Sequence, residues 1–123
     1  MFGTAENPGV KFEYRKTNGN QYWVDDPYSA LYNTWQTGPS NGRWNSAENL
    51  YIPAYKYAAV INFNTKERIS KKGSAMFLHV SNNSYTAGCT AISEANLLKI
   101  LRWLDPGKNP VIIQGTKSQV NAF

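Results

Sequence analysis

The second half of the chain has the clearest hydrophobic pattern. Residues 57–63 (YAAVINF) form a short, mostly apolar run closed by Asn64, which predicts a strand in the centre of a sheet. Residues 73–80 (GSAMFLHV) are nearly all apolar, so we expect a strand that is buried on both faces. The pattern therefore predicts two core strands in this half of the chain.

A helix is predicted after these strands. Ser93 is a residue type that caps helix N-termini, and leucine and isoleucine recur at helical spacing over residues 97–104. The Asp-Pro-Gly sequence at 105–107 should stop the helix. Residues 110–114 (PVIIQ) predict a final short strand, and residues 116–123 form a polar tail.

The first half is less regular and rich in aromatic residues. Residues 10–15 alternate apolar with polar side chains, which predicts a half-buried strand. Residues 17–20 (TNGN) predict a turn, and residues 21–24 (QYWV) the return strand of a hairpin. Residues 25–53 contain many Asn, Gly, Pro and Ser, yet also bulky rings that must pack on something. We expect this segment to be an ordered wrap.

Length and composition fit one folded domain over residues 1–123. With 41% hydrophobic and 17% charged residues, the chain can form a core without a metal or a disulfide. The short alternating runs and the aromatic content make a mainly β fold with one good helix the expected class. A net charge of +5 favours an anionic partner, such as a cell-wall polymer, nucleic acid or a membrane surface.

Several classes of protein are excluded. No run of 18 apolar residues is present, so we expect no membrane insertion. The start lacks a basic region followed by an apolar stretch, so we expect no secretory signal in this chain. One Cys forbids an internal disulfide, and one Cys with one His cannot supply the four ligands of a structural zinc site. We therefore expect no metal.

The single His and the single Cys are the candidates for chemistry. His79 lies near the end of the 73–80 strand, and Cys89 follows ten positions later, after the turn-forming run 81–84 (SNNS). Closing a ten-residue loop costs only about 2 kcal/mol, so the chain can bring the two side chains together. An imidazole can then take the thiol proton and stabilise the thiolate. Strand alternation places Phe77 on the face of His79, where we expect it to exclude water.

Gly88 adds a second element of a reactive site. It lets the backbone turn sharply just before Cys89, so that successive N–H groups can point at one place. Such amides form an oxyanion hole for a tetrahedral intermediate. The reaction class predicted is acyl transfer through a thioester.

Structural interpretations of the same residues compete with this one. A lone Cys is more often a small buried side chain than a nucleophile, and a lone His on an apolar strand is more often a satisfied core residue. The joint placement of His79, Gly88 and Cys89 gives the catalytic interpretation about equal support.

These motifs resemble the L,D-transpeptidase (YkuD-type) catalytic domain of bacterial cell-wall enzymes. That family has a His at the end of an apolar strand and then a Ser-His-Gly-Cys segment, which residues 76–79 (MFLH) and 86–89 (TAGC) match. Residues 96–114 (NLLKILRWLDPGKNPVIIQ), with 23–27 (WVDDP) and 32–35 (YNTW), resemble a divergent branch of the family. The resemblance covers most of the chain.

The resemblance implies a β-sandwich or mixed sheet with one helix after the nucleophile, and it implies roles. Cys89 would be the nucleophile and His79 its base, oriented by the backbone carbonyl just after it, with the amides of Gly88 and Cys89 as the oxyanion hole. Four further residues are expected to contact substrate: Phe77, Val80, Thr86 and Ala87.

The implied reaction is attack on the peptide stem of peptidoglycan at the L-centre of its third residue, with loss of D-Ala. An amine of a second stem then gives a 3→3 cross-link, and water gives L,D-carboxypeptidase activity instead. The resemblance implies no cofactor, no nucleic acid, a monomer, and action outside the cytoplasm, in the cell wall or periplasm.

The chain departs from the family pattern at several positions. Ala87 stands in place of the usual His, Thr86 in place of Ser, and Val80 in place of Gly. Ala91 stands in place of Arg or Asn and removes a polar contact. The opening strands of the family have no match, so we expect the chain to begin partway into the domain.

The alternative function is a non-catalytic cell-wall-binding module. Its basis is the net charge of +5 together with Trp23, Trp35 and Trp44 in the irregular half of the chain. It predicts salt-sensitive binding to peptidoglycan that does not depend on Cys89. Nucleic-acid binding has less support, because no recognition motif is present.

Overall fold

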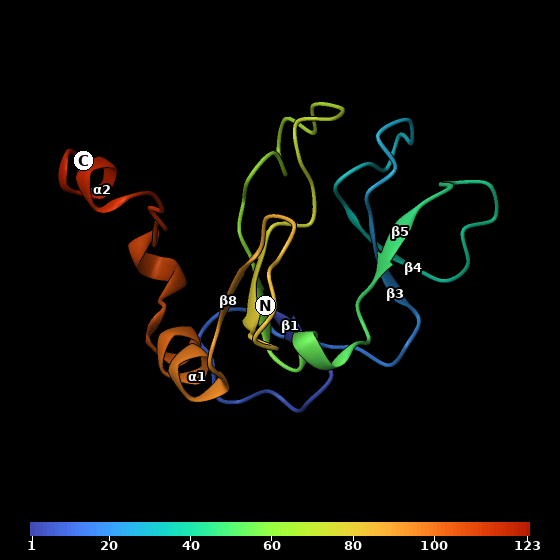
Figure 1. Cartoon of the computed structure of the whole chain (residues 1–123). Helices are drawn as coiled ribbons and strands as arrows, with labels where there is room; N and C mark the ends of the chain where they lie inside the picture. The colour runs from blue at the N-terminus through green and yellow to red at the C-terminus, as the bar shows by residue number, and fades with distance from the viewer.

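The strands form two separate sheets. The computed structural model describes all of residues 1–123, with a five-stranded sheet in the order β2-β1-β6-β7-β8 and a three-stranded sheet in the order β4-β3-β5 (Figure 1). The larger sheet contains β1 (Phe2–Gly3), β2 (Arg15–Lys16), β6 (Ala58–Val60), β7 (Phe77–Val80) and β8 (Thr90–Ile92). The smaller contains β3 (Gln21–Val24), β4 (Trp35–Thr37) and β5 (Ala47–Asn49). Two helices, α1 (Glu94–Trp103) and α2 (Lys117–Asn121), and two short 3₁₀ turns, η1 (Pro53–Tyr55) and η2 (Pro106–Lys108), complete the chain.

The larger sheet is mixed, and both core strands predicted from the hydrophobic pattern belong to it. β6 pairs antiparallel with β1 and β7, whereas β7 pairs parallel with β8. The observed strands β6 and β7 are shorter than the apolar runs 57–63 and 73–80 that predicted them. The run before β7 leaves extended geometry at Ala75, whose φ of 54° lies in the left-handed region. The expected mainly β fold with a mixed sheet is confirmed.

The predicted helix is confirmed as α1. The Ser93 hydroxyl accepts a hydrogen bond from the Asn96 N–H at 3.4 Å and so caps the first turn. Leu97 and Leu101 are fully buried and pack with Leu78 of β7 in a second, smaller core cluster. Each such leucine stabilises the fold by roughly 1.5–3 kcal/mol, which fixes α1 against the larger sheet.

The predicted hairpin in the first half is wrong, although its second strand is real. β3 covers residues 21–24 as expected, but its partners are β4 and β5. Residues 10–14 form no strand, although their side chains alternate between half-buried and exposed. The reason is that residues 25–53 return twice alongside β3 and occupy both of its edges. The expected ordered wrap is therefore the smaller sheet.

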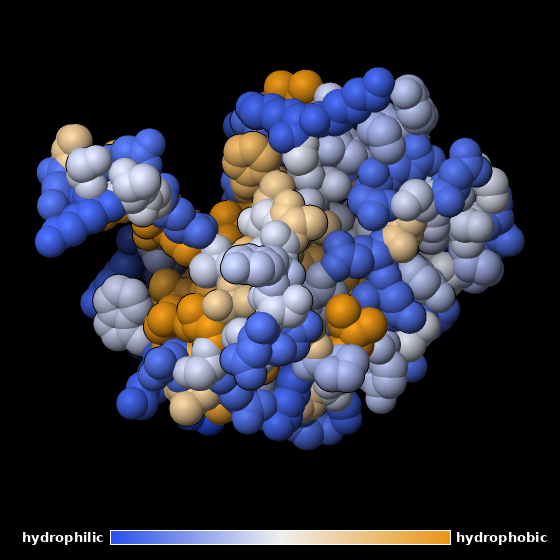
Figure 2. Space-filling view, viewed as in Figure 1, coloured by the Kyte–Doolittle hydropathy of each residue, from blue (hydrophilic) through white to orange (hydrophobic).

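The end of the chain also differs from the prediction. Residues 110–114 form no strand, and Val111, Ile112 and Ile113 are largely exposed. The polar tail includes α2, which begins with a capping box between Thr116 and Gln119. Figure 2 shows the end of the chain standing off the body of the molecule. β8 is an edge strand, but residues 110–114 make no ladder with it; the hydrogen bond between them runs from the Thr90 hydroxyl to the Gln114 side-chain oxygen.

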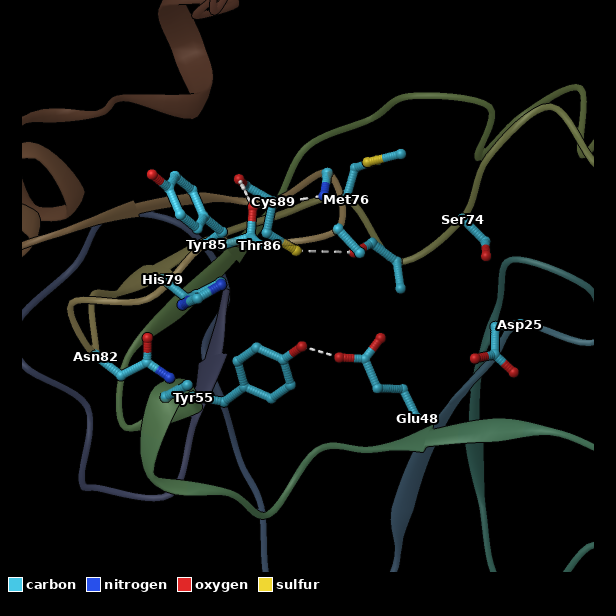
Figure 3. Close-up of a pocket in the computed structure, with 14 residues that line it drawn as sticks. Asp25, Glu48, Tyr55, Ser74, Met76, His79, Asn82, Tyr85, Thr86 and Cys89 are labelled. Carbon is cyan, nitrogen blue, oxygen red and sulfur yellow. Dashed lines mark hydrogen bonds between the residues drawn. The ribbon is translucent and has the colours of Figure 1, made fainter.

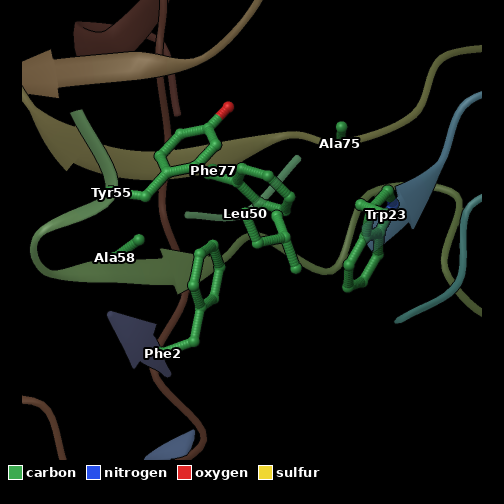
Figure 4. Close-up of a cluster of buried hydrophobic side chains, with 7 residues drawn as sticks. All are labelled: Phe2, Trp23, Leu50, Tyr55, Ala58, Ala75 and Phe77. Carbon is green, nitrogen blue, oxygen red and sulfur yellow. The ribbon is translucent and has the colours of Figure 1, made fainter. Parts of the chain in front are cut away.

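The main core lies between the two sheets and is largely aromatic. Phe77 of β7 is fully buried, and its ring meets those of Phe2, Trp23 and Tyr55 edge-to-face at 5.2–5.3 Å (Figure 4). Aromatic pairs in this arrangement add about 0.5–1.5 kcal/mol each beyond their burial. Because the cluster includes residues of β1, β3, η1 and β7, it fixes the strand that ends in His79.

Asn33 joins the two sheets by hydrogen bonds. Its side-chain oxygen accepts from the Trp23 indole N–H at 2.7 Å and from the Ala75 N–H at 3.1 Å. Its amide nitrogen donates to the carbonyls of Phe63 and Asn64 at 3.2 and 2.7 Å. The buried amide is therefore fully satisfied, and it anchors the backbone that leads into β7.

Candidate active site

A cavity of about 360 Å³ lies where the two sheets meet. One wall is the loop between β7 and β8 with His79 and Cys89 at its two ends, and the other contains Asp25, Glu48 and Tyr55 (Figure 3). The sequence-predicted pair therefore faces one common space. No arginine or lysine lines this cavity, although the chain as a whole has a net charge of +5.

The parallel pairing of β7 with β8 explains why His79 and Cys89 share the cavity. His79 is opposite Ala91 in the ladder, so Cys89, two residues earlier, lies beside Phe77. The Phe77 N–H indeed points at the Cys89 sulfur, at 3.4 Å. Residues two apart on a strand share a face, and paired residues do too, so both side chains project from one face of the sheet. The loop only has to span the gap between neighbouring strands.

The His79 imidazole is held in one orientation. Its Nδ1 lies 2.8 Å from the carbonyl oxygen of Val80. A carbonyl can only accept, so Nδ1 has a proton, and in the neutral form of the ring Nε2 then keeps a free lone pair. The residue is 7% exposed, and its ring lies edge-to-face with the Tyr55 ring at 5.3 Å. A neutral imidazole with an unprotonated Nε2 is the form that can act as a base.

The Cys89 side chain is half-buried and free. Its sulfur contacts the Ala75 carbonyl at 3.2 Å, as the donor, and accepts from the Phe77 N–H. Burial raises the pKa of this thiol above its ordinary value, against the effect of the Phe77 amide, and the nearby Glu48 adds to the rise. The resting sulfur is therefore a neutral thiol.

The loop before Cys89 adopts a conformation that requires glycine. Gly88 has φ 153°, and a Cβ placed there would meet the Met76 sulfur at 3.0 Å. The Thr86 hydroxyl donates to the Cys89 carbonyl at 2.6 Å and closes the turn. The Cys89 N–H has no hydrogen-bond partner within the protein, so it is available to an oxyanion.

The opposite wall was not predicted from the sequence. Its carboxyl group at Glu48 bonds to the Tyr55 hydroxyl. Burial, with the nearby charge of Asp25, raises the pKa of Glu48 to about 7. Asp25 looks in sequence like part of a turn, and Glu48 lies in a segment without a motif. Asp25 follows β3 directly and Glu48 lies on β5. The packing of these strands against the larger sheet brings both residues to the cavity.

Two of the four residues expected to contact substrate line the cavity, and the other two do not. Thr86 and Ala87 line the cavity. Phe77 lies in the core with no exposed surface, and Val80 packs against the second cluster, contributing to the site only through its carbonyl. The ring beside the imidazole is that of Tyr55.

The three tryptophans on which the cell-wall-binding alternative was based do not form an open surface. Trp23 and Trp44 are buried, and Trp35 is half-buried, packed between the Phe2 ring and the Arg15 guanidinium. Stacking on a sugar or a base needs an accessible ring face, which the two buried rings do not present.

Comparison with known families identifies the domain. The model of the L,D-transpeptidase catalytic domain (YkuD) matches residues 3–113, and the chain therefore belongs to this family. Proteins of this family act on peptidoglycan stem peptides, typically in the cell wall or periplasm. No curated protein and no solved structure matches the chain significantly. None of its helices has both the length and the hydrophobicity needed to cross a bilayer.

Proposed function

We propose that this protein is a cysteine acyltransferase that acts on peptidoglycan stem peptides, either as a transpeptidase or as a carboxypeptidase. The observation that supports it most is the placement of the only thiol and the only imidazole along the lining of one cavity. The imidazole, moreover, is held with Nδ1–H on the Val80 carbonyl and Nε2 free. Membership of the L,D-transpeptidase family gives the substrate class.

In this proposal Cys89 attacks the carbonyl carbon at the L-centre of the third stem residue. His79 Nε2 takes the thiol proton as the C–S bond forms. The carbonyl oxygen becomes an oxyanion held by the Cys89 amide and by the Gly88 amide, which exchanges its 3.4 Å bond to the Thr86 hydroxyl for the oxyanion. Collapse of the intermediate breaks the C–N bond, and the D-Ala amine leaves with the proton from His79. An amine or water then attacks the thioester and releases Cys89.

The raised pKa of Cys89 affects the timing of this reaction. Because the resting thiol is neutral and bonded to the Ala75 carbonyl, proton transfer accompanies the attack on the substrate. Small thiol reagents should therefore react slowly with the free protein at neutral pH. A bound stem peptide, which excludes water and orients its carbonyl, should react faster.

The test uses the single Cys. A carbapenem or thiol-directed probe should add one mass equivalent to the folded protein, and Cys89→Ala should give none. With disaccharide tetrapeptide as substrate, the protein should release D-Ala, and Cys89→Ala should not. A folded protein that stays unmodified by both probes at neutral pH and releases no D-Ala would refute the proposal. Salt-sensitive binding to sacculi that survives Cys89→Ala, without D-Ala release, would support the non-catalytic alternative.

A further inference from the structure

Tyr55 occupies the junction between the core and the candidate base. It is 3% exposed, and its ring lies edge-to-face with three others: Phe2 at 5.7 Å, Phe77 at 5.3 Å and His79 at 5.3 Å. Its hydroxyl bonds to the carboxyl group of Glu48. In Figure 3 the Tyr55 ring and the Glu48 side chain point toward each other along the second wall of the cavity, below His79 and Cys89 in this view.

We propose that Tyr55 and Glu48 form a positioning pair for His79. Through this pair, the three-stranded sheet holds the His79 imidazole, which projects from the five-stranded sheet, in the orientation in which it acts as a base. This inference rests on the proposed function, in which His79 Nε2 takes the proton of Cys89. Neither residue touches the reacting atoms. Both act through the imidazole.

The first support is geometric. The Val80 carbonyl holds the imidazole at Nδ1, but one hydrogen bond leaves the ring free to tilt about it. The Tyr55 ring, at 78° to the imidazole, blocks that movement from the side. Two contacts at different points of the ring fix the direction of Nε2, which neither would fix alone.

The second support is the way Tyr55 itself is held. Phe2 and Phe77 pack against its ring, and Glu48 holds its hydroxyl end. Glu48 belongs to β5, which pairs with β3 and not with the larger sheet. The Glu48–Tyr55 bond is therefore a direct link from the smaller sheet to the residue that touches the base.

The charge of Glu48 matters to the same group of residues. The other titratable side chains that line the cavity are Asp25, Tyr55, Tyr85, His79 and Cys89. A carboxylate at Glu48 favours a protonated imidazole and disfavours a thiolate, and no arginine or lysine in the lining offsets it. Glu48→Gln keeps an oxygen for the Tyr55 hydroxyl while removing the charge, so it separates the two effects.

The experiment compares Tyr55→Phe, Tyr55→Leu and Glu48→Gln with Tyr51→Phe, which removes the hydroxyl of an exposed tyrosine. The first readout is the ring-nitrogen NMR spectrum of the imidazole, unambiguous because the chain has one His. In the wild type, Nδ1 should resonate as protonated and Nε2 as unprotonated. Tyr55→Leu should shift the tautomer ratio, and Tyr55→Phe should shift it less.

The second readout is the acylation rate at saturating carbapenem as a function of pH. Removing the aromatic contact in Tyr55→Leu should lower the maximal rate about two- to tenfold. Glu48→Gln should move the pH profile and leave the tautomer ratio in place. Tyr51→Phe should match the wild type in both readouts.

Two results would overturn the inference. One is a tautomer ratio that stays at its wild-type value in folded Tyr55→Phe and Tyr55→Leu. The other is a pH profile in Glu48→Gln identical to that of the wild type. The NMR readout needs no turnover, so it tests the positioning pair even if the protein releases no D-Ala. A failed proposed function would instead appear as wild-type protein that no probe acylates.

Discussion

The two walls of the cavity are built in different ways. The wall that contains Thr86, Gly88 and Cys89 is a loop whose residues 82–88 are all exposed, and its shape depends on backbone conformation. The wall that contains Tyr55 and Glu48 is part of the aromatic core, and its shape depends on side-chain packing and a buried hydrogen bond. Cys89 thus lies at the end of a segment that can change with little effect on folding. Tyr55 and Glu48 belong to the part that stabilises the fold.

Replacing His79 should have the largest effect on reactivity. Loss of a positioned base typically lowers a rate by about 10²–10⁴-fold, so we expect His79→Gln to slow carbapenem acylation by that factor. Gln has a similar length and can still bond to the Val80 carbonyl, so the fold should be retained. Stopped-flow acylation measures this. Asn82→Ala, in the same cavity, is the control, and an equal loss in both variants would contradict the role of His79.

Asn33→Ala should have the largest effect on stability, because Asn33 joins the sheets that form the two walls. The substitution removes four hydrogen bonds and leaves buried partners unsatisfied, so we expect a loss of about 3 kcal/mol in the free energy of unfolding. Urea denaturation measures it. The exposed Asn62→Ala should lose less than about 0.5 kcal/mol. A change below about 1 kcal/mol in Asn33→Ala would show that the sheets are joined mainly by packing.

Gly88→Ala, in the loop between β7 and β8, should lower reactivity while leaving stability nearly unchanged. A side chain at this φ is strained by about 1–3 kcal/mol, and the loop can relieve that strain by moving. We expect acylation to fall about tenfold, with little change in the free energy of unfolding. The double variant with Met76→Ala removes the steric contact but not the strain. Full recovery of the rate in the double variant would assign the effect to Met76 alone.

The last prediction concerns the pH dependence of stability due to Glu48. Its pKa in the folded protein is about 7, above the value of 4.5 for an unperturbed carboxyl. The folded state therefore binds the proton more tightly, so this contribution to stability is complete below pH 4.5 and is lost as the pH rises through about 7. Relative to Glu48→Gln, the wild type should lose stability across this window in urea titrations. If the free energies of unfolding of the wild type and Glu48→Gln changed with pH in parallel, the raised pKa of Glu48 would be contradicted.

The candidate site shows where sequence reasoning worked and where it did not. The placement of His79 and Cys89 at one cavity could be predicted from the sequence, because the information is local: a strand, a short loop and a return. Tyr55 and Glu48 could not be found this way, because no motif surrounds them and their relation to His79 depends on how the second sheet docks. Strand alternation predicts that Phe77 lies on the face of His79 and excludes water there, and the structure places it in the core on that face. Alternation gives the face of the sheet, but not how deeply a side chain on that face is buried.

The same division holds for the fold. The sequence by itself determined α1 with its Ser93 cap, the positions of β3, β6 and β7, and the closeness of His79 and Cys89 to one cavity, since each depends on periodicity or on neighbours in the chain. The partners of β3 and the fate of residues 110–114 were decided only by the tertiary structure. Strand pairing and cavity walls depend on which apolar surfaces meet across distant segments, and a one-dimensional pattern does not encode that choice.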